Sequence, residues 1–195
     1  MTQTARLMDD ADQRPGKPIA DETSLAGGAA ALAVTQLELT NFRSYARGRL
    51  HTGALPIVLA GANGTGKTNL LEALSLLSPG RGLRGAKLAA IQRKAPADTM
   101  SRTDVFADSL WAVSAAIARP DGHWEIGTGL LPGNPNAPPR RALHLNAATA
   151  ESADLAELIP MLWLTPAMDR LFLEGASERR RFLDRLVFAL DSTHA

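Results

Sequence analysis

Polar and apolar residues alternate over residues 35–40, a pattern that predicts a strand with one solvated face. A second strand is expected over residues 46–51, after a turn at 41–45. Residues 56–60 form a short continuous apolar run that predicts a buried strand. Three more strands are predicted over residues 110–118, 124–128 and 141–145, with Asp121 and Gly122 as the hairpin turn between the first two.

Leucines at helical spacing predict a helix that begins near Lys67. Its apolar stripe consists of Leu70, Leu71, Leu74 and Leu77, and Glu72 and Ser75 are expected off that stripe. Pro79 and Gly80, which follow Ser78, predict the end of this helix, because proline lacks a backbone donor and glycine interrupts the pattern.

The last third of the chain is predicted to be mainly helical. We expect a helix over residues 153–159 with Ser152 as its cap, a brief strand over 161–164, and a helix from Thr165 and Pro166 to Gly175. A last helix is expected to open at Ser177 and Glu178, with an apolar stripe of Phe182, Leu183, Leu186, Val187 and Leu190. Trp111, Trp124 and Trp163 fall in predicted strands, where a core role is expected.

These patterns predict an incomplete α/β protein in three parts. Residues 1–33 combine acids, prolines and glycines without an apolar period and predict a disordered N-terminal extension. Residues 34–150 are expected to form a nucleotide-binding lobe, and residues 151–195 the start of a helical second lobe. Hairpins beside the apolar strand at 56–60 predict a mixed sheet with an antiparallel layer.

Composition adds little except for the distribution of arginine. The chain of 195 residues has a net charge of +1 and no cysteine, which fits a reducing cytosol and excludes disulfides. No run of eighteen apolar residues is present, which excludes a transmembrane helix. Arg81, Arg84 and Lys87 are candidates for contacts to DNA phosphates, although a solvated loop explains them equally. Arg179, Arg180 and Arg181 could serve DNA or carboxylates of the second lobe.

The chemistry of the chain concentrates in residues 61–68, here called the phosphate loop, which match the pattern G-x-x-x-x-G-K-[ST] between a predicted strand and a predicted helix. Its glycines allow successive amide groups to surround a polyphosphate, and the helix N-terminus adds partial positive charge. Lys67 is expected to contact the β- and γ-phosphates, and the Thr68 hydroxyl to be a ligand of Mg²⁺. The predicted nucleotide-binding residues are Gly61, Ala62, Asn63, Gly64, Thr65, Gly66, Lys67 and Thr68.

Several segments together resemble the RecF family of bacterial recombination mediators. They are residues 37–45, the phosphate loop and its continuation to residue 73, residues 80–84, and residues 178–184, which follow Thr165 and Pro166 in the sequence. The phosphate loop is shared by many proteins, whereas the arginine triplet at this distance from it is far more selective. The resemblance spans about residues 34–191.

The resemblance implies a P-loop ATPase of the ABC type, related to the SMC-like proteins that act on DNA. RecF proteins bind ATP, dimerise around it, bind gapped or single-stranded DNA, and work with RecO and RecR to load RecA. A cytoplasmic DNA repair, replication and recombination protein of the DNA-damage (SOS) response is therefore expected. The resemblance also implies that Arg43 lies near the nucleotide.

The chain departs from the family pattern in one large respect. It contains neither a signature segment rich in Ser, Gly and Gln nor an apolar strand that ends in paired acids, both of which ABC-type hydrolysis needs. We therefore interpret the chain as an N-terminal portion, and we do not expect it to hydrolyse ATP alone. Two alternatives stay open: a DNA- or ATP-binding remnant without turnover, and a small-molecule kinase, which only the phosphate loop favours.

Overall fold

A six-stranded antiparallel sheet forms the body of the molecule in the computed structural model, which describes residues 3–4, 32–94, 110–131, 140–166, 168 and 175–190. The strands of this sheet lie in the order β3-β2-β5-β6-β7-β8. Their bounds are Ala33–Phe42 (β2), Tyr45–His51 (β3), Ala112–Arg119 (β5), Gly122–Leu131 (β6), Arg140–Leu145 (β7) and Ala148–Thr149 (β8). The antiparallel layer predicted from the sequence is thus confirmed.

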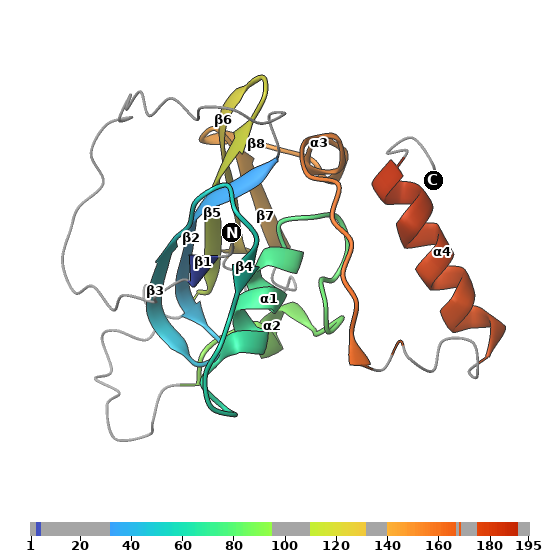
Figure 1. The fold of residues 1–195 in the computed structure, drawn as a ribbon, viewed down its shortest axis with the longest axis horizontal. Helices are drawn as coiled ribbons and strands as arrows, with labels where there is room; N and C mark the ends of the chain where they lie inside the picture. Colours follow the sequence, from blue (N-terminus) through green and yellow to red (C-terminus); the bar gives the residue numbers. More distant parts are fainter. Residues whose placement is uncertain are drawn as a thin grey trace.

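One face of this sheet is buried, because apolar side chains point to it at every second position. Leu37 and Leu39 of β2 lie opposite Ala115 and Val113 of β5, and Ala115 lies opposite Ile126 of β6. Buried residues of the helices α1 (Lys67–Ser75), α2 (Leu88–Ile91) and α3 (Ser152–Leu158) join the same core. Figure 1 shows α1 and α2 against the sheet.

Trp111 anchors α2 to the sheet from the residue before β5. Its indole N–H donates to the Leu88 carbonyl at 2.9 Å, and its ring meets that of Phe42 edge to face, with centroids 5.9 Å apart. Trp111 is fully buried, so its expected core role is confirmed.

The hairpin between β5 and β6 was predicted one residue too late. Arg119 pairs with Gly122, which leaves Pro120 and Asp121 as the turn and makes Gly122 the first residue of β6. The short strand β8 was not predicted. It follows a tight turn at Asn146 and Ala147, both of which have positive φ, and Ala147 gives no sequence signal for such a conformation.

The apolar run before the phosphate loop forms only a short strand, β4 (Ile57–Val58), and the prediction that it is buried is wrong. The Val58 side chain is 55% exposed. Within the described part of the chain β4 pairs only with β1 (Gln3–Thr4), in parallel, and only Leu59 of the run packs against the core. Continuous apolar character had suggested burial on both faces, whereas the described neighbours cover only one residue of the run.

The two residues of β1 lie in the extension that was expected to be disordered over residues 1–33. Most of that extension, residues 5–31, lies outside the described residues. None of the helices described here has the length and apolar character needed to cross a membrane.

Helix α1 buries a different face from the one its leucines suggested. Leu70 and Leu77 are buried, but Leu71 is 50% exposed, and Glu72 and Ser75 are fully buried instead. Polar contacts explain this orientation: the Ser75 hydroxyl accepts from the Leu83 backbone N–H at 2.6 Å, and Glu72 meets two arginines, as described below. The helix ends at Ser75, three residues before the predicted Ser78 boundary.

The C-terminal third differs from prediction in two places. Residues 161–164 form no strand, and α3 is capped by Glu151 rather than Ser152. Glu151 forms a capping box with Asp154, whose carboxylate accepts from the Glu151 backbone N–H at 2.7 Å. The predicted helix from Thr165 to Gly175 falls mostly on residues that are not described.

Helix α4 (Ala176–Leu190) confirms the predicted last helix. Its Arg185 guanidinium lies 4.8 Å from the centre of the Trp163 ring, a cation–π contact that connects α4 to the segment after α3. Because residues 161–164 form no strand, the prediction that Trp163 lies in a strand is wrong. Leu183 and Val187 of the predicted apolar stripe are exposed.

Candidate nucleotide site

The phosphate loop runs from the end of β4 into the first turn of α1, in the strand–loop–helix order that the motif requires. Gly64 and Gly66 have φ of 86° and 93°, a left-handed conformation that side chains disfavour. Gly66 is also the N-cap of α1, and its carbonyl accepts from the Asn69 and Leu70 backbone N–H groups. The glycine positions of the motif are therefore those at which the backbone bends.

Lys67 is held over the loop by the loop's own carbonyls. Its ammonium donates to the Gly61 carbonyl at 2.7 Å and to the Ala62 carbonyl at 2.6 Å. The Thr65 hydroxyl donates to the same Ala62 carbonyl at 2.9 Å. The loop thus curves around the lysine head group, which brings a positive charge to the centre of the predicted phosphate site.

Tyr45 closes one side of the phosphate loop. A Cβ atom at Gly66 would lie only 2.4 Å from the Tyr45 hydroxyl oxygen, and that hydroxyl donates to the Thr65 carbonyl at 3.4 Å. Partial burial raises the pKa of the Tyr45 phenol, so it stays a neutral donor. The Asn69 amide also donates to the Ser44 hydroxyl at 2.9 Å. The turn between β2 and β3 is thereby fixed to the loop and to α1.

Thr68 and the loop tip are accessible to a ligand. Asn63, Gly64, Thr65 and Thr68 are exposed, and the Thr68 hydroxyl makes no hydrogen bond within the described part of the chain. Thr68 stands in the first turn of α1, next to Lys67. A hydroxyl in this position can serve as an oxygen ligand for Mg²⁺.

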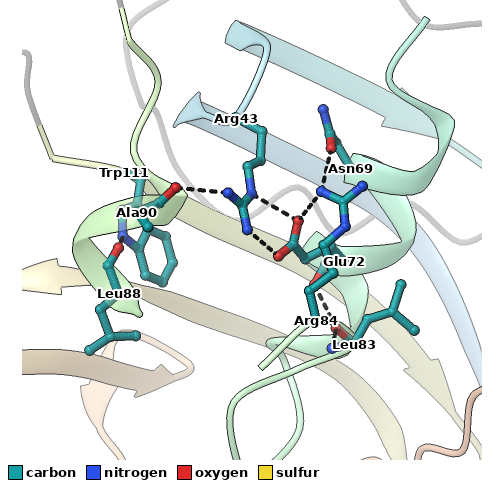
Figure 2. A network of polar contacts seen from close by, with 9 residues as sticks. Arg43, Asn69, Glu72, Leu83, Arg84, Leu88, Ala90 and Trp111 are labelled. Carbon is teal, nitrogen blue, oxygen red and sulfur yellow. Dashed lines mark hydrogen bonds and ion pairs between the residues drawn. The ribbon is translucent and has the colours of Figure 1, made fainter. Parts of the chain in front are cut away.

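Arg43 lies in the β2–β3 turn and points at α1. Its φ of 53° is a left-handed conformation that costs an L-residue about 1–2 kcal/mol. Its guanidinium donates to both carboxylate oxygens of Glu72, at 2.9 and 2.6 Å, and to the Ala90 carbonyl at 2.7 Å (Figure 2). No hydrogen bond joins Arg43 to the described phosphate loop, so it reaches the site through α1.

Arg84, predicted to contact DNA, is anchored to the same carboxylate. Its Nη1 donates to Glu72 Oε2 at 3.0 Å and to the Asn69 side-chain oxygen at 3.1 Å (Figure 2). The Glu72 side chain is 2% exposed, whereas that of Arg84 is 42% exposed. Arg84 thus has one anchored edge and one edge in solvent. Arg81 and Lys87 are exposed, and their side chains make no hydrogen bond or ion pair with the residues described.

Glu72 and Arg141 are neighbours of the loop that no sequence pattern pointed to. Arg141 of β7 reaches the end of α1, where its guanidinium donates to the carbonyls of Leu76, Ser78 and Gly80 and to the Thr128 hydroxyl. Burial lowers the pKa of Arg141, which nevertheless remains a cation. A carboxylate among the leucines of α1 was the only available sequence signal for Glu72.

The sequence is similar to proteins named RecF. The chain is 50% identical over 167 residues to the DNA replication and repair protein RecF of Caulobacter vibrioides, covering 85% of the chain and 41% of that protein. It is 46% identical over 162 residues to RecF of Mesorhizobium japonicum, covering 83% and 39% respectively. The chain is thus similar to the N-terminal two-fifths or so of these proteins. No protein-family model matches the sequence.

Solved RecF structures share the fold. A structure of the recombination mediator RecF-ATPrS in the RecFOR pathway aligns with a TM-score of 0.67 at 22% identity, and RecF-ATP aligns with 0.64 at 23%. Each alignment covers 84% of this chain but only 40% and 41% of the RecF chains. The chain thus shares the fold of the corresponding part of these RecF structures, and it spans about two-fifths of the length of the curated relatives that it matches.

Proposed function

We propose that the chain binds ATP at the phosphate loop. The observation that carries this proposal is the loop itself, in which Gly64 and Gly66 adopt left-handed conformations and Lys67 is centred over the curve. Lys67 exchanges its two backbone carbonyls for phosphate oxygens when a nucleotide binds, because a charged acceptor forms the stronger hydrogen bond. The α1 N-terminus adds favourable electrostatics for the same phosphates.

Mg²⁺ is the metal ion that fits this site. The exposed Thr68 hydroxyl supplies one hard oxygen ligand, and Mg²⁺ commonly takes its remaining ligands from nucleotide phosphates and water. The ion would neutralise phosphate charge at the loop. Arg43 is proposed to support the site indirectly, by fixing α1 through Glu72.

Lys67→Ala tests the proposal directly. Titration of the 195-residue chain with a fluorescent ATP analogue and Mg²⁺ should show binding that the variant weakens about 100-fold, since a lost charged hydrogen bond costs about 2–3 kcal/mol. Lys94→Ala removes an exposed lysine outside the loop and should bind like the unmodified chain. Equal affinities for the Lys67 and Lys94 variants would refute ATP binding at this loop.

We propose further that the complete protein is a cytoplasmic DNA repair and replication protein of the RecF type. It would bind gapped or single-stranded DNA as an ATP-dependent homodimer and help RecO and RecR to load RecA. Identity to proteins named RecF supports this role, and the exposed Arg81 and Lys87 support contact with a phosphate backbone. The small-molecule kinase alternative retains no support beyond the phosphate loop.

The DNA contact has a salt-dependent signature. Replacing both Arg81 and Lys87 by glutamine should lower the slope of log affinity against log salt by about 1.4 on single-stranded DNA, since each phosphate contact contributes about 0.7. Arg49→Gln is the matched control, because Arg49 is already paired with Glu38 at 2.8 Å. An unchanged slope in the double variant would exclude these two side chains from the DNA interface.

A further inference from the structure

Glu72 is a buried carboxylate that joins three segments far apart in the sequence. From α1 it holds Arg43 of the β2–β3 turn at 2.6 Å and Arg84 at 3.0 Å. Residues 81–87, here called the basic loop, contain Arg84 together with the exposed Arg81 and Lys87. Figure 2 shows both guanidinium groups directed at this one carboxylate from different sides.

The position of Glu72 along α1 relates it to the phosphate loop. It lies four residues after Thr68, and residues at this spacing share one face of a helix. Asn69 belongs to the same short helix, and its amide oxygen accepts from Arg84 while its amide nitrogen donates to Ser44. A shift of the first turn of α1 therefore reaches Arg84 through two side chains.

The attachment of the basic loop to α1 is strongest at Glu72, because only this contact is an ion pair. Two guanidinium groups share one carboxylate with 2% exposure, and a charged hydrogen bond is worth more in such a site than at the surface. Arg84 has no other ion pair within the described residues, so the carboxylate of Glu72 is the main attachment of the basic loop to α1. The hydrogen bonds from Arg84 to the Asn69 side-chain oxygen and from the Leu83 N–H to the Ser75 hydroxyl add two uncharged links.

We propose that Glu72 is a positioning residue that couples nucleotide binding at the phosphate loop to the placement of the basic loop. This inference rests on the proposed ATP binding. When Lys67 moves from the Gly61 and Ala62 carbonyls to phosphate oxygens, the first turn of α1 moves with it, and Glu72 transmits the shift to Arg84. The solvent edge of Arg84, with Arg81 and Lys87, is thereby presented differently to a polyanionic nucleic-acid backbone.

Limited trypsin digestion of the 195-residue chain measures this coupling, because trypsin cuts after Arg81, Arg84 and Lys87. Cleavage rates at Arg81 and Lys87, followed by mass spectrometry, should change about fivefold on addition of ATP and Mg²⁺, within the usual range of coupling between sites. In Glu72→Gln the ratio of the cleavage rates with and without nucleotide should fall to about 1, measured at an ATP concentration that the fluorescent titration shows to saturate this variant.

Two further variants complete the design. Glu38→Gln makes the same substitution in the half-buried Glu38–Arg49 pair and should keep the ATP-dependent change in cleavage rate. Arg84→Gln leaves the Arg43–Glu72 pair intact and should abolish the ATP-dependent change in cleavage rate at Arg81 and Lys87. This variant tests the coupling even where Glu72→Gln does not fold.

The outcomes separate the coupling from the proposed function. ATP binding to the unmodified chain without a change in cleavage rate would overturn the coupling and leave nucleotide binding intact. The same holds if the Glu72 and Arg84 variants retain the ratio. Failure of the fluorescent titration itself would overturn both proposals.

Discussion

Arg141→Met should lower the free energy of unfolding by about 3 kcal/mol, because it orphans buried carbonyls at the end of α1, each of which costs about 1–3 kcal/mol. Leu76 and Ser78, whose carbonyls accept from Arg141, are both buried, so water replaces the lost donors poorly. Methionine keeps most of the apolar stem and removes the guanidinium. Thermal denaturation should show a fall in Tm of about 6–12 °C for a chain of this size.

Arg140→Met provides the control for this experiment. Arg140 precedes Arg141 on β7 and is exposed, so the same substitution there should change Tm by less than about 2 °C. Arg141→Lys should fall between the two, since lysine keeps the charge but cannot reach several carbonyls with a planar fork. If the Arg140→Met and Arg141→Met variants have the same Tm, Arg141 does not stabilise the end of α1.

Gly66→Ala should abolish ATP binding and destabilise the fold by about 3 kcal/mol. The left-handed φ of 93° costs alanine about 1–2 kcal/mol, and the new Cβ would collide with the Tyr45 hydroxyl at 2.4 Å, a steric overlap that typically costs about 1–3 kcal/mol. Either the tyrosine or the loop must move. Nucleotide titration and thermal denaturation should therefore both respond.

Two companion variants separate backbone strain from collision. Gly64 has a φ of 86° but no atom within 4 Å of its virtual Cβ, so Gly64→Ala should lose only about 1–2 kcal/mol of stability. Adding Tyr45→Ala to Gly66→Ala should recover stability relative to Gly66→Ala alone. The steric argument is wrong if Gly64→Ala and Gly66→Ala behave alike and the double variant shows no recovery.

The parts of the fold that depend on local pattern were predictable from the sequence. Strands β2, β3, β5, β6 and β7 follow alternation and turn residues, and the phosphate loop follows the spacing of its glycines and Lys67. Both signals are local, because side-chain alternation and backbone conformation are fixed by neighbouring residues. Their boundaries shifted by a few residues, as with the turn at Pro120 and Asp121.

The surroundings of the loop could not be predicted in this way. Arg141 contacts the Leu76 carbonyl across 65 residues, and Arg43 contacts Glu72 across 29, so no local period encodes either pairing. Glu72 was assigned to the polar side of α1 because a carboxylate among leucines ordinarily faces solvent. Two arginines from other segments reverse that preference by supplying charge and hydrogen bonds inside the core.

The pairing of β2 with β5 has a consequence for the order in which the chain folds. The Thr35 hydroxyl reaches the Ala116 carbonyl across 81 residues, and the phosphate loop and α1 lie in the chain between these strands. The β5–β6 hairpin closes through two residues and can form early, whereas the β2–β5 ladder must enclose a long segment first. We therefore expect the β2–β5 ladder to form after the β5–β6 hairpin, and its closure encloses the phosphate loop and α1 between the two strands.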